Sequence, residues 1–423
     1  MLNVIRMKYD ANAFLQLLTG VLLTLFLLPS FSLAAGPVHG AKAGGMGTAF
    51  SAVADDGSAI AFNPAGLINV RGAQIYGGGT AVIPSTRYEN AAGQSERTES
   101  KVFFPPYLYL SDDFGYKDMV FGLGFFSPFG IGGRYWSEDG LTKYISTEST
   151  IATFSVNPVI AWQILPWIAV GGGPYYMLVK NTGEKMMDQT GLGWSDAKFK
   201  MDGDGDGFGY SFGALIVPVK QWSIGLCYRS SVKVDLDGTA RINNIAPPLQ
   251  STFGGTHFKT DVSTSVDLPQ VATLGIAWMP TDNLTIAMDI DWSDWSCFNE
   301  QDIDFKTEVP AVGFTDITVP MDWKDSYVIG VGFDMKMNSK LSLRGGYAYG
   351  NNPVPDETLS PASPDANQQS VSIGMGYRLR DNIVIDAFYL VEILKTRDVQ
   401  NTILSGTYDN ICHFTGVGLG YRF

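Results

Sequence analysis

Apolar residues occupy every second position in segment after segment of this chain. One C-terminal segment shows the pattern well, because Val371, Ile373, Met375, Tyr377 and Leu379 alternate with serine, glycine and arginine. Successive side chains of a β-strand point to opposite faces, so each such strand has one apolar face and one face of small or polar residues. After residue 35 the chain has no uninterrupted run of about 18 apolar residues, which a transmembrane helix requires. The pattern predicts an all-β protein.

The connections between these segments indicate which kind of β-protein to expect. Short turns, such as residues 380–382, alternate with long polar stretches, such as 182–206 and 238–263. A soluble β-sandwich also has alternating strands, but short turns at one end and long loops at the other are typical of outer-membrane barrels. A closed barrel also lets strands satisfy all their backbone hydrogen bonds in lipid. We therefore predict a fourteen-stranded antiparallel transmembrane β-barrel, with its long loops outside the cell.

Fourteen segments carry the strand pattern, and the even number fits a bacterial barrel. They lie at residues 72–84, 101–111, 119–128, 149–165, 167–181, 207–219, 222–237, 264–280, 284–301, 322–337, 340–350, 369–380, 382–397 and 407–423. The last strand ends on the aromatic Phe423, as outer-membrane barrels commonly do. Seven outer loops and six inner turns place both ends of the barrel in the periplasm.

Charge and composition exclude several other classes of protein. The chain has 29 Lys and Arg against 42 Asp and Glu, so it lacks the basic surface that a nucleic-acid partner would need. Its 3 Cys and 3 His are too few for a disulfide scaffold or a zinc site. No Walker or dinucleotide-binding motif occurs, so no cofactor is expected.

The N-terminal part of the chain divides into two segments. Arg6 and Lys8 precede an apolar stretch at 15–28, and small residues follow, which predicts a signal peptide over residues 1–34 rather than an uncleaved membrane anchor. Residues 35–71 lack the alternation and precede the barrel, which we place at residues 72–423. Such a segment either hangs in the periplasm or folds back into the barrel lumen as a hatch.

Short motifs along the mature chain resemble one known family. They are Gly44 to Phe50, Ala54 to Asp56, the triplet Asn63, Pro64 and Ala65, Phe125 to Gly130, Gly209 to Gly213, Gly225 to Ser230, Asp267 to Pro269, and Asp291 to Ser296. Each motif is loose, but together their order and spacing resemble the outer-membrane long-chain fatty acid transporter (FadL-type) family, which also includes aromatic-hydrocarbon transporters.

This resemblance implies a function without catalysis. It implies a monomer in the outer membrane of Gram-negative bacteria, in contact with outer-membrane lipid and lipopolysaccharide. Residues 35–71 would plug the lumen, and hydrophobic ligands such as fatty acids or aromatic hydrocarbons would diffuse passively and leave sideways through the barrel wall. An alternative is a surface receptor or adhesin that acts through its long outer loops.

The third predicted strand contains a candidate for this lateral opening. Pro128 has no N–H and cannot complete a ladder bond, and Gly130 follows closely, so we expect a break at Ser127, Pro128, Phe129 and Gly130. The turn at Asn63 is expected to hold this break open. Alternatively, Pro128 merely marks the end of the strand.

Three basic residues are candidates for binding an anionic head group in the lumen. Strand parity predicts that Lys180, Arg229 and Lys233 face inward, and the resemblance favours Lys180. Inward carboxylates could instead neutralise any of them. The acidic segment 202–207 resembles half of a calcium loop, but we expect it to form a hairpin end, because Gly213 stands where a glutamate is required.

Overall fold

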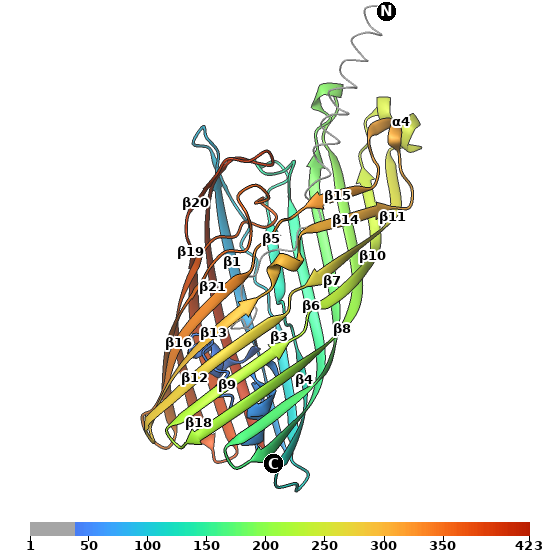
Figure 1. The fold of residues 1–423 in the computed structure, drawn as a ribbon. Coiled ribbons are helices and arrows are strands. Elements are labelled where there is room, and N and C mark those ends of the chain that lie inside the picture. The colour runs from blue at the N-terminus through green and yellow to red at the C-terminus, as the bar shows by residue number, and fades with distance from the viewer. Residues whose placement is uncertain (1–38) are drawn as a thin grey trace, which may run out of the picture.

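The computed structural model describes residues 39–423, so the predicted signal peptide lies outside the described part of the chain. One antiparallel sheet closes on itself, because β1 pairs with β21 along its whole length (Figure 1). The strands are β1 Gln74–Glu89, β2 Ser95–Arg97, β3 Pro106–Asp112, β4 Met119–Phe126, β5 Ile131–Tyr135, β6 Glu148–Leu165, β7 Ile168–Met187, β8 Ala197–Val219, β9 Trp222–Arg229, β10 Val232–Asn243, β11 His257–Leu268, β12 Val271–Thr281, β13 Leu284–Ser293, β14 Glu300–Phe305, β15 Ile317–Pro320, β16 Ser326–Lys336, β17 Leu341–Gly350, β18 Gln368–Arg380, β19 Ile383–Leu394, β20 Arg397–Val399 and β21 Gly406–Arg422. Among these residues no helix is long and apolar enough to cross a membrane.

These segments make fourteen barrel strands, as the sequence predicted. Three barrel strands are each interrupted once, so that β4 continues as β5, β9 as β10, and β11 as β12. Four short strands, β2, β14, β15 and β20, lie in the outer loops. The fold class inferred from alternation is therefore confirmed.

The two faces of the barrel differ as the alternation requires. On β16, Tyr327, Val331 and Phe333 are exposed on the outer face, while Gly330 and Gly332 face the lumen. Near the periplasmic end Trp222 and Trp278 stack with their ring centroids 5.9 Å apart, and exposed aromatic residues of this kind are typical of a membrane interface.

One side of the barrel is taller than the sequence predicted. β6, β7 and β8 have 18, 20 and 23 residues, and this side rises above the rest with α4 (Pro247–Phe253) at its top (Figure 1). The expected loop 182–206 is therefore mostly strand. The acidic segment 202–207 is not a hairpin end, because it lies inside β8, where buried Phe199 and Met201 continue the inward face.

Residues 39–70, which we call the hatch segment, lie inside the barrel. They form α2 (Ala41–Gly45), α3 (Ala59–Phe62) and the 3₁₀ helix η3 (Pro64–Asn69), most of whose residues are buried. Glycines on the inner wall make room for this segment: a Cβ on Gly332 would lie 2.0 Å from the Met46 carbonyl oxygen, and one on Gly225 2.3 Å from that of Ser51. The small inward residues thus let the wall and the hatch segment pack backbone to backbone.

Candidate functional site

The triplet Asn63, Pro64 and Ala65 fixes the hatch segment to one side of the barrel. The Asn63 amide nitrogen donates to the Ser51 carbonyl at 2.8 Å and to the Ala214 carbonyl of β8 at 3.0 Å, and its oxygen accepts from the Ala65 N–H at 3.1 Å. Asn63 is fully buried. It therefore joins the hatch segment to β8, where Gly213 leaves space for it.

Charged residues fix the opposite side of the hatch segment. Lys42 contacts Asp55 at 2.7 Å and Asp334 of β16 at 3.4 Å. Arg344 of β17 lies 2.6 Å from Asp386 and 3.5 Å from Asp334. These groups line a cavity of about 660 Å³ at the periplasmic end of the lumen. Lys42 and Arg344 therefore both have carboxylate partners.

Strand three is broken where the sequence predicted a break. Phe126 of β4 pairs with Ser155 of β6, and Ile131 of β5 pairs with Ala152. Residues 127–130 therefore face only Thr153 and Phe154, so strand three carries two extra residues at this point. Gly130 has φ 79°, a conformation that favours glycine. The segment bulges out of the ladder.

Two residues that the sequence analysis missed stabilise this break. The Thr153 hydroxyl accepts from the Phe129 N–H at 3.1 Å and donates to the Gly130 carbonyl at 3.0 Å, which replaces lost ladder bonds. The His39 imidazole nitrogen lies 3.0 Å from the Ser127 carbonyl oxygen. The contact between hatch segment and break is therefore made by His39, and the hydrogen bonds of Asn63 go to Ser51, Ala65 and β8 instead of the break, contrary to our expectation.

The break opens the ladder between strands two and three. The last paired residues of β3 and β4 are Leu108 and Phe125, and β5 pairs with β6 alone. Residues 98–105 stay attached to β1, since Val82 and Phe103 form an isolated bridge. Within the described chain, one backbone hydrogen bond crosses this opening, from the Glu99 N–H to the Tyr135 carbonyl, at 2.8 Å. Phe103 and Tyr135 stack beside it at 6.4 Å.

The broken segment reaches into a large apolar cluster in the upper barrel. Phe129 packs edge-on against Trp295 at 6.3 Å, and Trp295 lies 5.1 Å from Trp323. This upper cluster includes Met187, Phe199 and buried side chains from most of the outer loops. An apolar contact path therefore runs from the upper lumen to the break in the wall.

Lys185 of β7 is buried within this apolar region. It is 1% exposed, it pairs in register with Phe199, and its ammonium has no hydrogen-bond or carboxylate partner among residues 39–423. The outer face of β7 changes from exposed Leu178 to charged Lys180 and Glu184, so Lys185 lies above the apolar belt. Burial lowers the pKa of Lys185 well below its usual value, because desolvation disfavours the ammonium.

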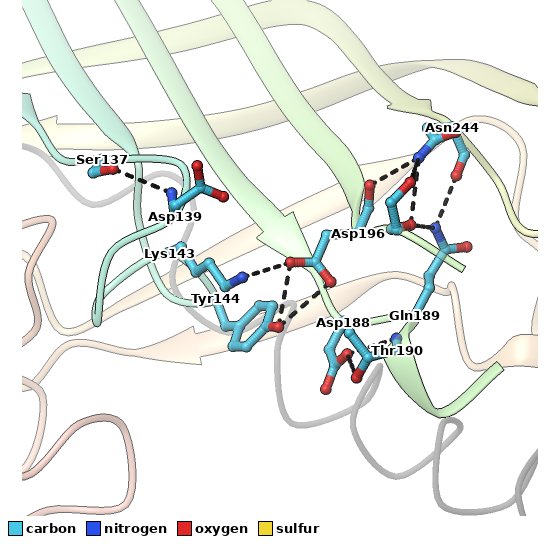
Figure 2. A network of polar contacts seen from close by, with 10 residues as sticks. Ser137, Asp139, Lys143, Tyr144, Asp188, Gln189, Thr190, Asp196 and Asn244 are labelled. Atoms are coloured by element: carbon cyan, nitrogen blue, oxygen red, sulfur yellow. Dashed lines mark hydrogen bonds and ion pairs between the residues drawn. The ribbon is translucent and has the colours of Figure 1, made fainter. Parts of the chain in front are cut away.

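Three outer loops, at residues 136–147, 188–196 and 244–256, lie above this lysine, and we call them the roof. The loop before β6 docks on β7 through the Met186 N–H to the Lys143 carbonyl, 2.7 Å, and the Thr147 N–H to the Glu184 carbonyl, 2.8 Å. Figure 2 shows an ion pair between two of these loops: the Lys143 ammonium contacts the Asp196 carboxylate, 2.8 Å away. Gln189 and Asn244 hold the neighbouring hairpins through their side-chain amides.

Of the three predicted head-group residues, the structure places one in the lumen. Lys180 and Lys233 are exposed on the outer wall, so both predictions were wrong. Residues 175–179 are apolar at every position, so alternation could not assign a face to Lys180. Lys233 was misassigned because Ser230 and Ser231 interrupt the strand and shift its register by one residue.

Arg229 faces the lumen as predicted and is 8% exposed. Its guanidinium lies between the rings of Phe126, 5.2 Å away, and Tyr175, 5.0 Å away. One of its nitrogens donates to the Ala61 carbonyl of the hatch segment at 3.0 Å. Arg229 therefore contacts both the hatch segment and the residue that precedes the wall break.

In residues 39–423 no group of three or more His, Cys, Asp or Glu is arranged to hold a metal ion. Asp204 and Asp206 point outward from β8. The calcium alternative for segment 202–207 thus has no supporting geometry in the described chain.

Comparison with known proteins identifies the family. Residues 26–423 match the family described as outer membrane protein transport protein (OMPP1/FadL/TodX). The chain belongs to this family. An outer membrane protein of Neisseria meningitidis serogroup B is 25% identical over 387 residues, which cover 81% of both chains. The long-chain fatty acid transport protein of Escherichia coli O6:H1 is 24% identical over 381 residues, covering 81% of this chain and 83% of its own.

Solved structures agree with this assignment at the level of the fold. A Pseudomonas aeruginosa FadL homologue superposes with a TM-score of 0.80 at 17% identity, covering 92% of this chain and 99% of its own. The Pseudomonas putida toluene transporter TodX gives a TM-score of 0.72 at 18% identity, with the same two coverages. This member of the family is thus an outer-membrane protein with the shared barrel fold.

Proposed function

We propose that this protein carries long-chain fatty acids, or similar hydrophobic acids, across the outer membrane by passive diffusion. The observation that carries the proposal is the break at residues 127–130, which joins the upper apolar cluster to an opening in the wall. Relatives named as fatty acid and toluene transporters support hydrophobic ligands as a class. A lateral exit suits such ligands, because it leads into the hydrocarbon layer and avoids the polar cavity at the periplasmic end of the lumen.

Four unpartnered donor groups in the upper barrel favour an acid over a neutral hydrocarbon. Lys185 Nζ, Asn181 Nδ2 and the indole N–H groups of Trp295 and Trp323 are buried without a hydrogen-bond partner in the described chain. All four groups are donors. Buried donors are costly unless an acceptor is available, and a carboxylate offers several acceptor sites. A toluene-like ligand offers no such acceptor.

The proposed route begins outside, beneath the roof of loops, with the carboxylate at Lys185 and the acyl chain among the apolar side chains. It continues past Phe129 and leaves between strands two and three. No energy source enters this scheme, because the ligand moves down its gradient. We further propose that the protein acts as a monomer, with its outer apolar belt in lipid and its taller outer part among lipopolysaccharide.

A two-residue deletion tests the lateral exit. Removing Pro128 and Phe129 leaves Ser127 and Gly130 opposite Phe154 and Thr153, which restores a continuous ladder between Phe126 and Ile131. We expect this variant to reach the outer membrane and bind fatty acid, but to lose most fatty acid uptake by cells.

Two controls make the result specific. Deleting Ala91 and Ala92, which are exposed at the tip of an outer turn, should leave uptake unchanged. Phe129→Ala keeps the bulge but removes the side chain that contacts Trp295, and it should retain uptake. Full uptake through the sealed wall would contradict the lateral route.

A further inference from the structure

The outer loop between β17 and β18, residues 351–367, folds into the upper barrel, and we call it the inner loop. Residues 358–366 are buried at every position, although they form neither helix nor strand. Most loops stay on the surface, because water there satisfies their backbone polar groups. Leu359 and Ala362 belong to the upper apolar cluster, so the inner loop packs beside the proposed site of the acyl chain.

Arg397 of β20 holds the two ends of the inner loop together. Its guanidinium donates to the Val354 carbonyl at 2.7 Å and to the Asp365 carbonyl at 2.9 Å. The same guanidinium contacts the Asp356 carboxylate at 2.6 Å, on the exposed side of the loop. Arg397 therefore has a carboxylate partner that water also reaches.

The buried side of the inner loop faces a polar patch on the inner wall of the barrel. Glu392 of β19 pairs in register with Ser370 of β18 and Cys412 of β21. Several buried polar atoms of this region have no hydrogen-bond partner in residues 39–423, although such atoms are normally satisfied. They are Ser360 Oγ, Asp365 Oδ2, Gln368 Nε2, Glu392 Oε2 and Asn410 Nδ2. The packing of the inner loop on the wall thus rests on an incompletely satisfied group of side chains.

Two carboxylates in this region are almost completely buried. Asp365 of the inner loop is 2% exposed and Glu392 of the wall is 8% exposed, and we call them the carboxyl pair. The two carboxylates repel each other, and the buried Arg134 guanidinium of β5 attracts both. Arg397 also attracts Asp365, and Cys412 adds an uncharged thiol beside Glu392.

The charges around the carboxyl pair do not balance when both acids are ionised. Arg397 is already paired with Asp356, which leaves two buried carboxylates facing the Arg134 guanidinium among the described residues. A buried charge in excess is costly, and uptake of one proton removes it. Burial raises the pKa of Asp365, which lies outside the membrane-spanning strands, to about 7.

We propose that protonation of the carboxyl pair holds the inner loop docked in the upper barrel and that loss of this proton releases it. With both acids ionised, their repulsion and the cost of burial favour a position in which Asp365 reaches water. Docking takes up a proton, so the docked state is most stable below the ordinary pKa of aspartate, about 4. It loses stability as the pH rises to about 7, and the loss then levels off.

Release of the inner loop would uncover the upper apolar cluster. The consequence for transport rests on the proposed function, whereas the release itself needs no ligand. Because the loop closes again behind a ligand, it changes the rates of entry and exit and leaves the equilibrium affinity unchanged.

Hydrogen exchange of the purified protein without ligand tests the release. Exchange over residues 356–366, corrected for intrinsic exchange with the exposed turn at residues 91–94, should become about tenfold faster between pH 5.5 and 7.5. Asp365→Asn keeps the oxygen that accepts from the Ala366 N–H but cannot ionise, so its exchange should stay slow at both pH values. Glu392→Gln removes the other member of the pair and should reduce the pH effect in the same way.

Asp356→Asn is the matched control within the same loop. It removes an exposed carboxylate and its ion pair with Arg397, which should speed exchange by less than about fivefold at both pH values. The pH effect itself should persist in this variant. Equal pH effects in the unmodified protein, Asp365→Asn and Glu392→Gln would overturn the proposal, and so would loss of the effect in Asp356→Asn.

A neutral ligand separates this proposal from the proposed function. A long-chain alcohol does not ionise, so its association rate with the purified protein should rise several-fold from pH 5.5 to 7.5, and Asp365→Asn should remove the rise. If exchange depends on pH as expected but the association rate does not, the inner loop does not control entry and the proposed consequence for transport is wrong. If the protein binds no long-chain ligand at all, the proposed function fails, whereas the exchange measurements still decide whether the carboxyl pair holds the loop.

Discussion

Lys42 and Arg344 in the lower lumen differ from Lys185 in the upper lumen in the partners of their charges. Below, Lys42 and Arg344 each contact two carboxylates, and Asp289 accepts the Phe50 and Ser51 N–H groups at 2.9 and 2.8 Å. Above, Lys185 is buried without a carboxylate partner in residues 39–423 and pairs in register with Phe199 of the apolar upper cluster. Paired charges hold the hatch segment in one position, whereas unpaired donors are available to an incoming ligand. We therefore expect the paired charges of the lower lumen to hold the hatch segment, and Lys185 in the upper lumen to bind ligand.

Asp289→Ala should have the largest effect in the lower lumen. It leaves two buried backbone N–H groups of the hatch segment without an acceptor, at a cost of about 1–3 kcal/mol for each group. We expect faster proteolysis within residues 46–56 and a higher ion conductance through the barrel in planar bilayers. Asp282→Ala is the control, since its ion pair with Lys220 is exposed on a periplasmic turn. Equal conductance of the two variants would contradict a structural role for the lower charges.

In contrast to Asp289→Ala, Lys185→Met should weaken ligand binding without lowering folding stability. Losing a charge-assisted hydrogen bond costs about 1.5–3 kcal/mol, so fatty acid binding should weaken by roughly tenfold or more. Folding stability should not fall, because the substitution removes a buried cation without a partner. Binding is measured with purified protein, and thermal unfolding is measured on the same samples. Lys180→Met, five residues earlier on the outer face, should leave both unchanged.

Much of this architecture could be predicted from sequence, and the failures have local physical causes. Alternation identified the fourteen strands and Pro128 marked the break, because both depend on short-range backbone geometry. Lys180 and Lys233 were placed on the wrong face because a single inserted residue, or a stretch that is apolar on both faces, reverses or hides parity. Lys185 was missed because its isolation arises from strands and loops that are distant in sequence, a feature that no local pattern records.

The pH dependence of fatty acid binding should also distinguish Lys185 of the upper lumen from the paired charges of the lower lumen. Because burial lowers the pKa of Lys185, part of the free protein has an uncharged amine at a pH where exposed lysines are ionised. A carboxylate stabilises the ammonium and raises this pKa, so binding takes up protons. Above the pKa of the free protein, affinity for the carboxylate should fall as pH rises, by up to about tenfold per pH unit. Lys185→Arg, which stays charged, should remove this dependence. A pH dependence that persists in Lys185→Arg would assign it to another group.

A substitution that loosens the roof above Lys185 should have the smallest effect on ligand binding. Asp196→Asn removes the carboxylate that contacts the Lys143 ammonium, but the backbone bonds of this loop to Glu184 and Met186 remain. Ion pairs that are partly exposed are typically worth about 0.2–1 kcal/mol, so we expect a two- to fivefold faster dissociation of bound fatty acid. Hydrogen exchange over residues 142–147 should rise in parallel, while exchange in the hatch segment stays unchanged. Faster exchange without faster dissociation would show that the roof moves independently of the ligand, and that the acid enters and leaves the upper cluster by another path.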